Sequence, residues 1–266
     1  MRFHHYSPAP SLQPFLQGYI EADCRSSLRN STYTLFPNGL SGIFFNFGNT
    51  GKLILEKEYD TPAISIFGQI DKHFTVADAP GFYSLGVLFK PTNLSKFLRV
   101  DISEFTNRAV DGTLLRADLR RVHEQLTEAT RIQQKITLLN EYFCRALLNL
   151  SPQNTISDHA VHLIDTQENL TIEKLAGLLH ISQRYLEMNF KRSVGLSPKS
   201  YSLIQRFMRI ERKLKKEPEP RQHLNFGDEY YDQMHFTKDF KRFTGHTPGR
   251  YLLENLEMGK SYLIRP

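Results

Sequence analysis

Hydrophobic positions along the first 110 residues fall into short runs that turn residues interrupt. Each run is rich in aromatic or β-branched side chains, and Gly, Pro, Asn or Asp separates it from the next. This pattern is typical of antiparallel strands. The expected strands are 33–36, 43–47, 52–55, 63–67, 74–76 and 83–89. We predict a small antiparallel β-barrel or sandwich, flanked by short helices near 12–16 and 94–98.

After residue 110 the apolar period changes to three and four residues, which indicates amphipathic helices. Over 113–154 this pattern predicts a helical linker, suited either to packing within the chain or to pairing two copies of it. We slightly favour packing within the chain. An all-helical region then spans 155–256, and 257–266 forms a tail. The predicted fold class is α+β, with a β-rich N-terminal domain at 1–112.

The helical C-terminal region contains an internal repeat with an offset of 50 residues. Residues 190–198 (FKRSVGLSP) recur at 240–248 (FKRFTGHTP), and the likeness extends over 182–201 and 232–251. Seven of these twenty aligned positions are identical, namely Gln, Phe, Lys, Arg, Gly, Pro and Tyr. Because two copies are too few for a solenoid, we interpret them as one supersecondary unit used twice.

Capping residues indicate that the unit is a helix, a short turn and a second helix. Thr171 and Ser182 are good N-cap residues, with Asp232 in place of Ser182 in the second copy. Gly195 falls where a helix end needs the left-handed backbone, and Pro198 suits the first turn of a following helix. This order of elements is a helix-turn-helix.

The second helix of each unit leaves a narrow, mostly polar face outside its apolar stripe. The positions on this face are Arg184, Glu187, Met188 and Lys191 in the first copy, and Met234, Thr237, Lys238 and Lys241 in the second. Short polar helices of this kind read base edges in the DNA major groove. Two solvated faces of a helical bundle would give the same pattern, so periodicity alone leaves both interpretations open.

The stretch 230–251 reads YYDQMHFTKDFKRFTGHTPGRY, and the region 156–256 resembles the DNA-binding domain of the AraC/XylS family of bacterial transcription regulators. The resemblance implies a sequence-specific regulator that binds double-stranded DNA. It implies two helix-turn-helix units joined by a long helix, about Pro198 to Lys216, with second helices at about 183–194 and 233–244 in successive major grooves. The base or phosphate contacts that it implies are Gln183, Arg184, Glu187, Met188, Gln233, Met234, Thr237 and Lys238.

The first helix of the second unit departs from the family pattern. Asn225 and Glu229 stand where the family usually has Ala and Gly, and Gly227 lies in mid-helix, where glycine is unfavourable. We therefore expect this helix to be short or frayed and the docking of the second unit to be weakened.

The β-rich region resembles, more weakly, the N-terminal domain found in one branch of the same family. Pro10–Phe15 and Gly86–Pro91 carry this resemblance. Such domains bind a small effector or mediate dimerisation, so the resemblance implies a small-molecule effector or a homodimer as further partners. The many aromatic side chains here fit a ligand pocket and fit a filled core equally well.

Length and charge agree with this interpretation. A chain of 266 residues favours two domains. It carries 34 Lys+Arg and 28 Asp+Glu, a net charge of +6, and the excess is concentrated at 206–216. A basic excess favours a polyanionic partner, although it is also typical of a solvated helix face.

The sequence gives no support to catalysis or to a membrane location. It contains no nucleophile elbow, phosphate loop, dinucleotide fingerprint or zinc-protease motif. Two cysteines, Cys24 and Cys144, exclude a four-thiolate zinc site, and His159 and His162 lack a third ligand at a useful spacing. We expect no catalytic residue, metal or cofactor. No apolar run reaches the length of a membrane span and the N-terminus lacks a signal-peptide core, so we expect a cytoplasmic protein.

Overall fold

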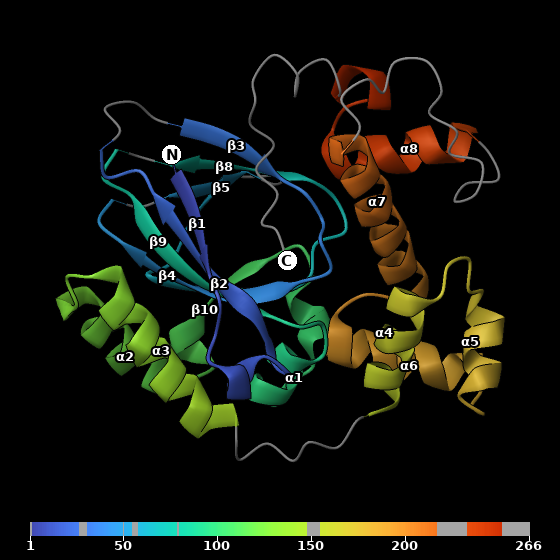
Figure 1. Cartoon of the computed structure of the whole chain (residues 1–266), viewed down its shortest axis with the longest axis horizontal. Coiled ribbons are helices and arrows are strands. Elements are labelled where there is room, and N and C mark those ends of the chain that lie inside the picture. The colour runs from blue at the N-terminus through green and yellow to red at the C-terminus, as the bar shows by residue number, and fades with distance from the viewer. Residues whose placement is uncertain are drawn as a thin grey trace.

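The computed structural model describes residues 2–26, 31–49, 51–54, 58–78, 80–147, 155–216 and 233–251. A two-sheet N-terminal domain lies beside a helical C-terminal domain (Figure 1). The predicted α+β class is confirmed. Within the described ranges, no helix is both long enough and apolar enough to cross a bilayer.

Two antiparallel sheets build the N-terminal domain. The larger has the strand order β1 (Arg2–Tyr6), β2 (Leu16–Asp23), β9 (Tyr83–Phe89), β4 (Ser41–Phe47), β7 (Ile64–Phe67) and β10 (Ala109–Asp111). The smaller has the order β3 (Ser31–Leu35), β8 (Phe74–Asp78), β5 (Lys52–Ile54) and β6 (Glu58–Asp60). In the larger sheet, Gly86 of β9 stands between Ile20 and Phe44. A Cβ atom at Gly86 would lie 2.5 Å from the ring of Phe44, so glycine lets that ring cross the strand.

The six predicted strands are present, with ends within two residues of the prediction. The helix expected near 12–16 is wrong. The chain instead forms a 3₁₀ turn, η1 (Pro10–Leu12), and Leu16 already begins β2, because the long pairing of β2 with β9 outweighs local helix propensity. The helix expected near 94–98 is confirmed as α1 (Asn93–Leu98).

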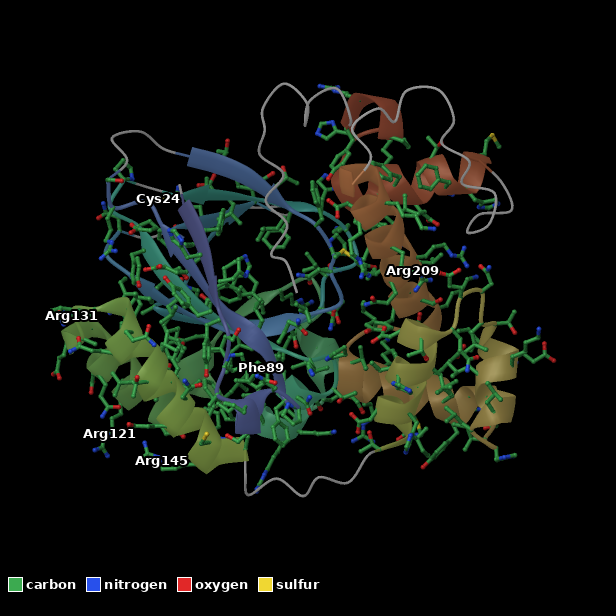
Figure 2. All side chains as sticks on the ribbon, in the orientation of Figure 1. Cys24, Phe89, Arg121, Arg131, Arg145 and Arg209 are labelled. Atoms are coloured by element: carbon green, nitrogen blue, oxygen red, sulfur yellow. The ribbon has the colours of Figure 1, made fainter. Side chains whose placement is uncertain are left out.

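Two helices cover the N-terminal domain, α2 (Asp118–Glu128) and α3 (Ile132–Leu147), after the short 3₁₀ turns η2 (Ile102–Phe105) and η3 (Gly112–Leu114). Their apolar side chains are buried in the same core as Phe89, whose ring centroid lies 5.6 Å from that of Phe143. Arg121 of α2 and Arg145 of α3 are exposed on the outer side, as is Arg131 between the two helices (Figure 2). The apolar faces of both helices therefore pack within the chain.

The C-terminal domain consists of α4 (Ile156–Thr166), α5 (Ile172–Leu178), α6 (Gln183–Val194), α7 (Pro198–Lys216) and α8 (Gln233–Thr244). One apolar cluster runs through these helices. Helix α7 has the bounds predicted from the sequence. The atypical positions Asn225, Gly227 and Glu229, the expected cap Asp232 and the tail 257–266 lie outside the described residues.

Candidate nucleic-acid interface

Helices α5 and α6 form the first helix-turn-helix unit. The hydroxyl of Thr171 accepts a hydrogen bond from the amide of Lys174, and that of Ser182 accepts one from the amide of Tyr185, so both predicted N-caps are confirmed. His180 turns the chain between the helices with φ of 54°. Helix α6 ends at Gly195 in the left-handed conformation, as predicted.

Burial divides α6 into two faces. Leu186, Phe190 and Val194 are completely buried at fourfold spacing, which fixes the rotation of the helix. The opposite face is exposed along its whole length, and Met188 keeps 51% of its surface in solvent. All five predicted contact residues of this helix are exposed, namely Gln183, Arg184, Glu187, Met188 and Lys191.

Tyr185 is a candidate contact that sequence reasoning missed. Its ring is 44% exposed near the N-terminus of α6, between Arg184 and the buried Leu186. From sequence alone, an aromatic residue next to an apolar one is usually assigned to the core. The N-cap and the buried stripe fix the orientation of α6, and this orientation places Tyr185 toward solvent. A phenol at a helix N-terminus is suited to a phosphate oxygen or a base edge.

The second unit presents a comparable helix. Phe236, Phe240 and Phe243 of α8 are buried, and the last two rings pack on Phe207 of α7 at 5.5 and 5.3 Å. Met234, which is 78% exposed, Lys238 and Lys241 lie on the outer face, and Thr237 is half-buried. The side chain of Gln233 lies outside the described residues.

Helix α7 separates the two units. Its 19 residues correspond to a length of about 28 Å at ~1.5 Å per residue. One turn of a DNA duplex advances about 34 Å, so α7 has the dimension needed to hold two reading helices about one turn apart. The basic run on α7 is not one solvated stripe, because Arg206 and Arg209 are half-buried while Arg212 and Lys213 are exposed.

The N-terminal domain contacts both α6 and α8 near their C-terminal ends, at equivalent positions of the repeat. Arg192 of α6 lies 3.7 Å from a carboxylate oxygen of Asp101, and Arg242 of α8 lies 2.5 Å from one of Asp71. We call these two ion pairs the arginine clasps. They leave the exposed faces of α6 and α8 free of the N-terminal domain.

Backbone contacts reinforce the clasps. The hydroxyl of Thr106 donates to the carbonyl of Gly195, and the amide of His73 donates to the carbonyl of Arg242 at 3.4 Å. Nδ1 of His73 also lies 3.0 Å from that carbonyl. Helix C-termini expose carbonyl groups without helical partners, so these bonds satisfy part of both ends.

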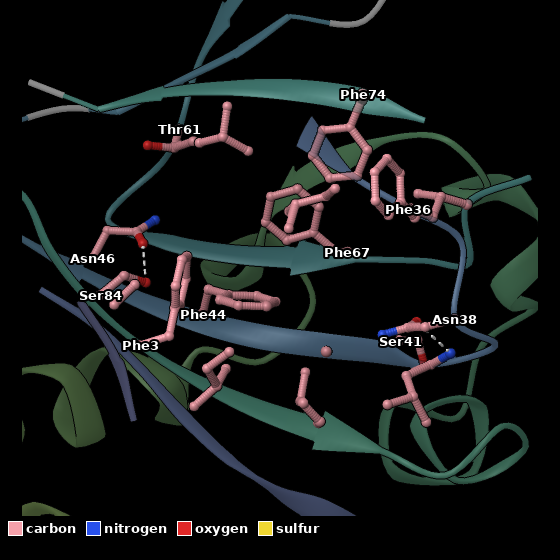
Figure 3. Close-up of a pocket in the computed structure, with 18 of the residues that line it drawn as sticks. Phe3, Phe36, Asn38, Ser41, Phe44, Asn46, Thr61, Phe67, Phe74 and Ser84 are labelled. Atoms are coloured by element: carbon pink, nitrogen blue, oxygen red, sulfur yellow. Dashed lines mark hydrogen bonds between the residues drawn. The ribbon is translucent and has the colours of Figure 1, made fainter. Parts of the chain in front are cut away.

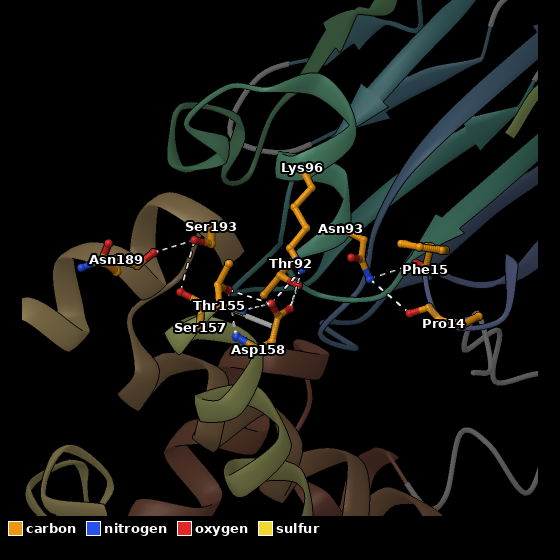
Figure 4. A network of polar contacts seen from close by, with 10 residues as sticks. All are labelled: Pro14, Phe15, Thr92, Asn93, Lys96, Thr155, Ser157, Asp158, Asn189 and Ser193. Atoms are coloured by element: carbon orange, nitrogen blue, oxygen red, sulfur yellow. Dashed lines mark hydrogen bonds and ion pairs between the residues drawn. The ribbon is translucent and has the colours of Figure 1, made fainter. Parts of the chain in front are cut away.

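A third contact between the domains is centred on Asp158 of α4 (Figure 4). Its carboxylate accepts hydrogen bonds from Lys96, at 2.7 and 2.9 Å, and from Thr92, and it forms a capping box with Thr155. Burial raises the pKa of Asp158, but these hydrogen bonds outweigh burial and hold the pKa below its ordinary value. Asp158 thus caps α4 and docks it on the N-terminal domain.

A second carboxyl on α4, that of Asp165, has the opposite shift. Burial raises the pKa of Asp165, although the hydroxyl of Tyr201 donates to it at 3.1 Å. His159 and His162 lie on the same helix, and no group of three metal-ligating side chains exists among the described residues. Cys24 is buried and Cys144 is half-buried, and the two do not form a disulfide.

Comparison with known proteins identifies the C-terminal region. Residues 175–254 match the family described as "Helix-turn-helix domain". This region is an AraC-type helix-turn-helix domain. The resemblance of the C-terminal region to AraC/XylS regulators is therefore confirmed, and α5, α6 and α8 are elements of the domain. Residues 4–111 match a second family, described as a domain of unknown function (DUF6597).

One relative is also a helix-turn-helix protein by name. The uncharacterised HTH-type transcriptional regulator YtdP of Bacillus subtilis is 28% identical over 105 residues, which are 39% of this chain and 14% of the relative. The chain thus spans about a seventh of the length of that relative.

Solved structures show more distant likeness. ToxT from Vibrio cholerae, in the apo form of a single-residue variant, has 13% identity and a TM-score of 0.49, with 93% of this chain and 98% of that chain covered. The C-terminal domain of AraT from Geobacillus stearothermophilus has 24% identity and a TM-score of 0.35, with 43% and 92% covered. At these TM-scores the likeness carries no argument about what the chain binds.

Proposed function

We propose that the chain is a sequence-specific DNA-binding transcription regulator, in which α6 and α8 read two adjacent segments of the major groove. The observation that carries the proposal is the exposed face of α6, which the caps and the buried stripe hold outward, together with its second copy on α8. The helix-turn-helix match over 175–254 supports it. The length of α7 supports simultaneous reading of both segments.

Side-chain chemistry suggests a role for each exposed position. Arg184 is suited to donate to guanine, Glu187 to accept from the amino group of cytosine, and Met188 and Met234 to contact thymine methyl groups. Lysines bind phosphates and set the register, and the polar side chains reach base edges or phosphates. The lysines in this role are Lys191, Lys238 and Lys241, and the polar side chains are Gln183, Gln233 and Thr237.

The N-terminal domain, in this proposal, senses a small molecule and transmits its presence to the second unit. Phe36 supports this route, because its ring lines a pocket of the β domain and also lies 5.9 Å from the ring of Tyr251, which contacts Phe240 of α8. The protein would work in the cytoplasm, and a homodimer would place two such chains on one operator.

Selection of bound fragments from a random duplex pool tests the proposal. The full chain is expected to enrich a site with two conserved segments about one helical turn apart. The Arg184→Ala variant is expected to lose the preference at one base pair, while the matched Arg121→Ala variant on the outer face of α2 keeps the whole site. Recovery of random fragments with an affinity equal to that for scrambled duplex would refute sequence-specific reading.

A further inference from the structure

The two arginine clasps reach the N-terminal domain on separate segments of the chain. Asp101, which pairs with Arg192 of α6, directly precedes η2. Asp71, which pairs with Arg242 of α8, lies between β7 and β8. The N-terminal domain can couple the two contacts only if these segments are themselves joined.

Asn107 joins them. Its side-chain amide donates to a carboxylate oxygen of Asp71 at 2.9 Å, and its side-chain carbonyl accepts from the backbone amide of Asp71 at 3.0 Å. The backbone amide of Asn107 donates to the carbonyl of Gln69 at 2.9 Å. The preceding residue, Thr106, donates to the carbonyl of Gly195 at the end of α6. Two consecutive residues therefore contact the end of α6 and the segment that contacts α8.

The backbone around Asn107 is adapted to this contact. Its φ is 56°, in the left-handed region that asparagine adopts more readily than most residues with a side chain. Close by, the backbone of Phe105 lies so near Gly68 that a Cβ atom on Gly68 would collide with the carbonyl of Phe105. The segments 68–71 and 105–107 are therefore in direct contact, and Asn107 provides the side-chain hydrogen bonds between them.

The segment that carries Asp71 is also anchored on its apolar side. Phe67, Ile70 and Phe74 line the pocket between the two sheets, and the rings of Phe67 and Phe74 stack with their centroids 6.4 Å apart (Figure 3). Asp71 follows Ile70 directly and pairs with α8. Apolar packing thus fixes the path of the segment, and the hydrogen bonds of Asn107 fix the direction of the carboxylate.

The two carboxylate oxygens of Asp71 have different partners. Oδ1 accepts from Asn107, and Oδ2 accepts from Arg242. The side chains of Asp71 and Arg242 are 26% and 41% exposed, and an ion pair this exposed is weak when both side chains must be ordered to form it. Because Asn107 already orders Asp71, loss of the Asn107 side chain is expected to weaken the contact with Arg242.

We propose that Asn107 is a positioning residue, which orients Asp71 toward Arg242 and so fixes α8 relative to α6 for binding to one duplex. The clasps lie near the C-terminal ends of both helices and leave their outer faces exposed, so the fixed orientation favours DNA binding. The role in DNA binding rests on the proposed function, whereas the coupling of Asn107 to Arg242 does not.

A double-mutant cycle tests the coupling without DNA. Asn107→Gly removes the side chain and keeps the backbone, because glycine adopts a positive φ without strain. Urea unfolding of the full chain is measured for Asn107→Gly, for Arg242→Ala and for the double variant. The double variant is expected to raise the equilibrium constant for unfolding about three- to five-fold less than the product of the two single effects.

The other clasp provides the control cycle. Arg192→Ala opens the contact with Asp101 and leaves Asp71 in place. The effects of Arg192→Ala and Asn107→Gly on the equilibrium constant are expected to multiply to within about two-fold. Effects that multiply in both cycles, or an equal shortfall in both, would overturn the coupling of Asn107 to Arg242.

Binding to DNA tests the consequence for the reading helices. Fluorescence anisotropy compares the selected site with two duplexes that each keep only one of its two segments. Asn107→Gly is expected to weaken binding to the full site about three-fold and to leave both single-segment duplexes unchanged, because only the full site needs both helices in place. An unchanged or tighter full site, or an equal loss on all three duplexes, would overturn the assigned role in orienting α8.

Asn169→Gly is the matched control for the substitution itself. Asn169 also has a left-handed backbone, with φ of 57°, and lies in the turn between α4 and α5. This variant is expected to bind the full site and the single-segment duplexes as the native chain does. A loss confined to the full site in Asn169→Gly as well would refute the assignment to Asn107.

The two measurements separate this inference from the proposed function. A shortfall in the Arg242 cycle together with a loss confined to the full site supports both. Selection of a specific site together with effects that multiply in both cycles refutes the role of Asn107 alone. Failure to select any specific site refutes the regulator, and the Arg242 cycle then decides by itself whether Asn107 positions Asp71.

Discussion

Replacement of Asp158 by alanine is expected to destabilise the chain by about 2–4 kcal/mol. The carboxylate caps α4 in a capping box, which is worth about 1 kcal/mol. It also accepts charge-assisted hydrogen bonds from Lys96, and such bonds contribute about 1.5–3 kcal/mol. Only 25% of the Lys96 side chain and 20% of the Asp158 side chain are exposed, so solvent screens this pair less than a surface pair.

Urea unfolding followed by far-UV circular dichroism measures this loss, since the chain has no tryptophan to report by fluorescence. Glu58→Ala is the control, because the Lys52–Glu58 pair is about half exposed on both sides, so solvent screens it and its loss is expected to cost much less than the loss of Asp158. An Asp158→Ala variant no less stable than the Glu58→Ala variant would refute the reasoning.

The dependence of this effect on pH has a definite sign. The folded-state pKa of Asp158 is lowered, whereas an unfolded aspartate titrates near pH 3.9. The ionised form therefore stabilises the fold above about pH 4, and this contribution disappears as the pH falls through the folded-state pKa. The stability difference between the native chain and Asp158→Ala is expected to be largest at neutral pH and to shrink in acid. A difference that grows on acidification would contradict the cause given for the shift.

Three further predictions concern the reading helices. Arg184→Ala is expected to weaken binding to the selected site by about 1–3 kcal/mol and to relax the preference at one base pair. Arg192→Ala on the same helix is expected to leave base preference unchanged, and fluorescence anisotropy on a panel of single-base variants of the site distinguishes the two. Lys241→Ala is expected to weaken all duplexes alike and to reduce the salt slope by about one phosphate contact, and a steeper slope would count against a phosphate role. Phe190→Ala is expected to lower stability by about 3–5 kcal/mol in a urea melt, because its ring is completely buried, and a loss below about 1 kcal/mol would refute its place in the core.

Local chemistry explains why so much of the first helix-turn-helix unit could be predicted. Thr171, Ser182 and Gly195 act within one helical turn of themselves, and the buried stripe of α6 follows from the helical period alone. Because α8 is the repeat of α6, the same interpretation applies to it. The structure adds that most of the expected contact residues are exposed. Their role in binding DNA stays a prediction.

Long-range pairing explains what the sequence did not predict. Strand β1 contains consecutive histidines and β10 has only three residues, so neither has a clear alternating pattern, and both exist because a neighbouring strand supplies their hydrogen bonds. The partners of Arg192 and Arg242 are also distant in the sequence.

The arginine clasps tie α6 and α8 to the N-terminal domain, in addition to the connection that α7 provides. Helices tied by α7 alone could pivot to follow half-sites set closer or farther apart. One added base pair turns the second half-site by about 34–36° around the duplex and moves it by about 3.4 Å, because a turn contains about 10–10.5 pairs. To follow that change, the chain would have to release Asp101 or Asp71. Under the proposed function, we therefore expect these two contacts with the N-terminal domain to limit the operator spacings that the chain tolerates.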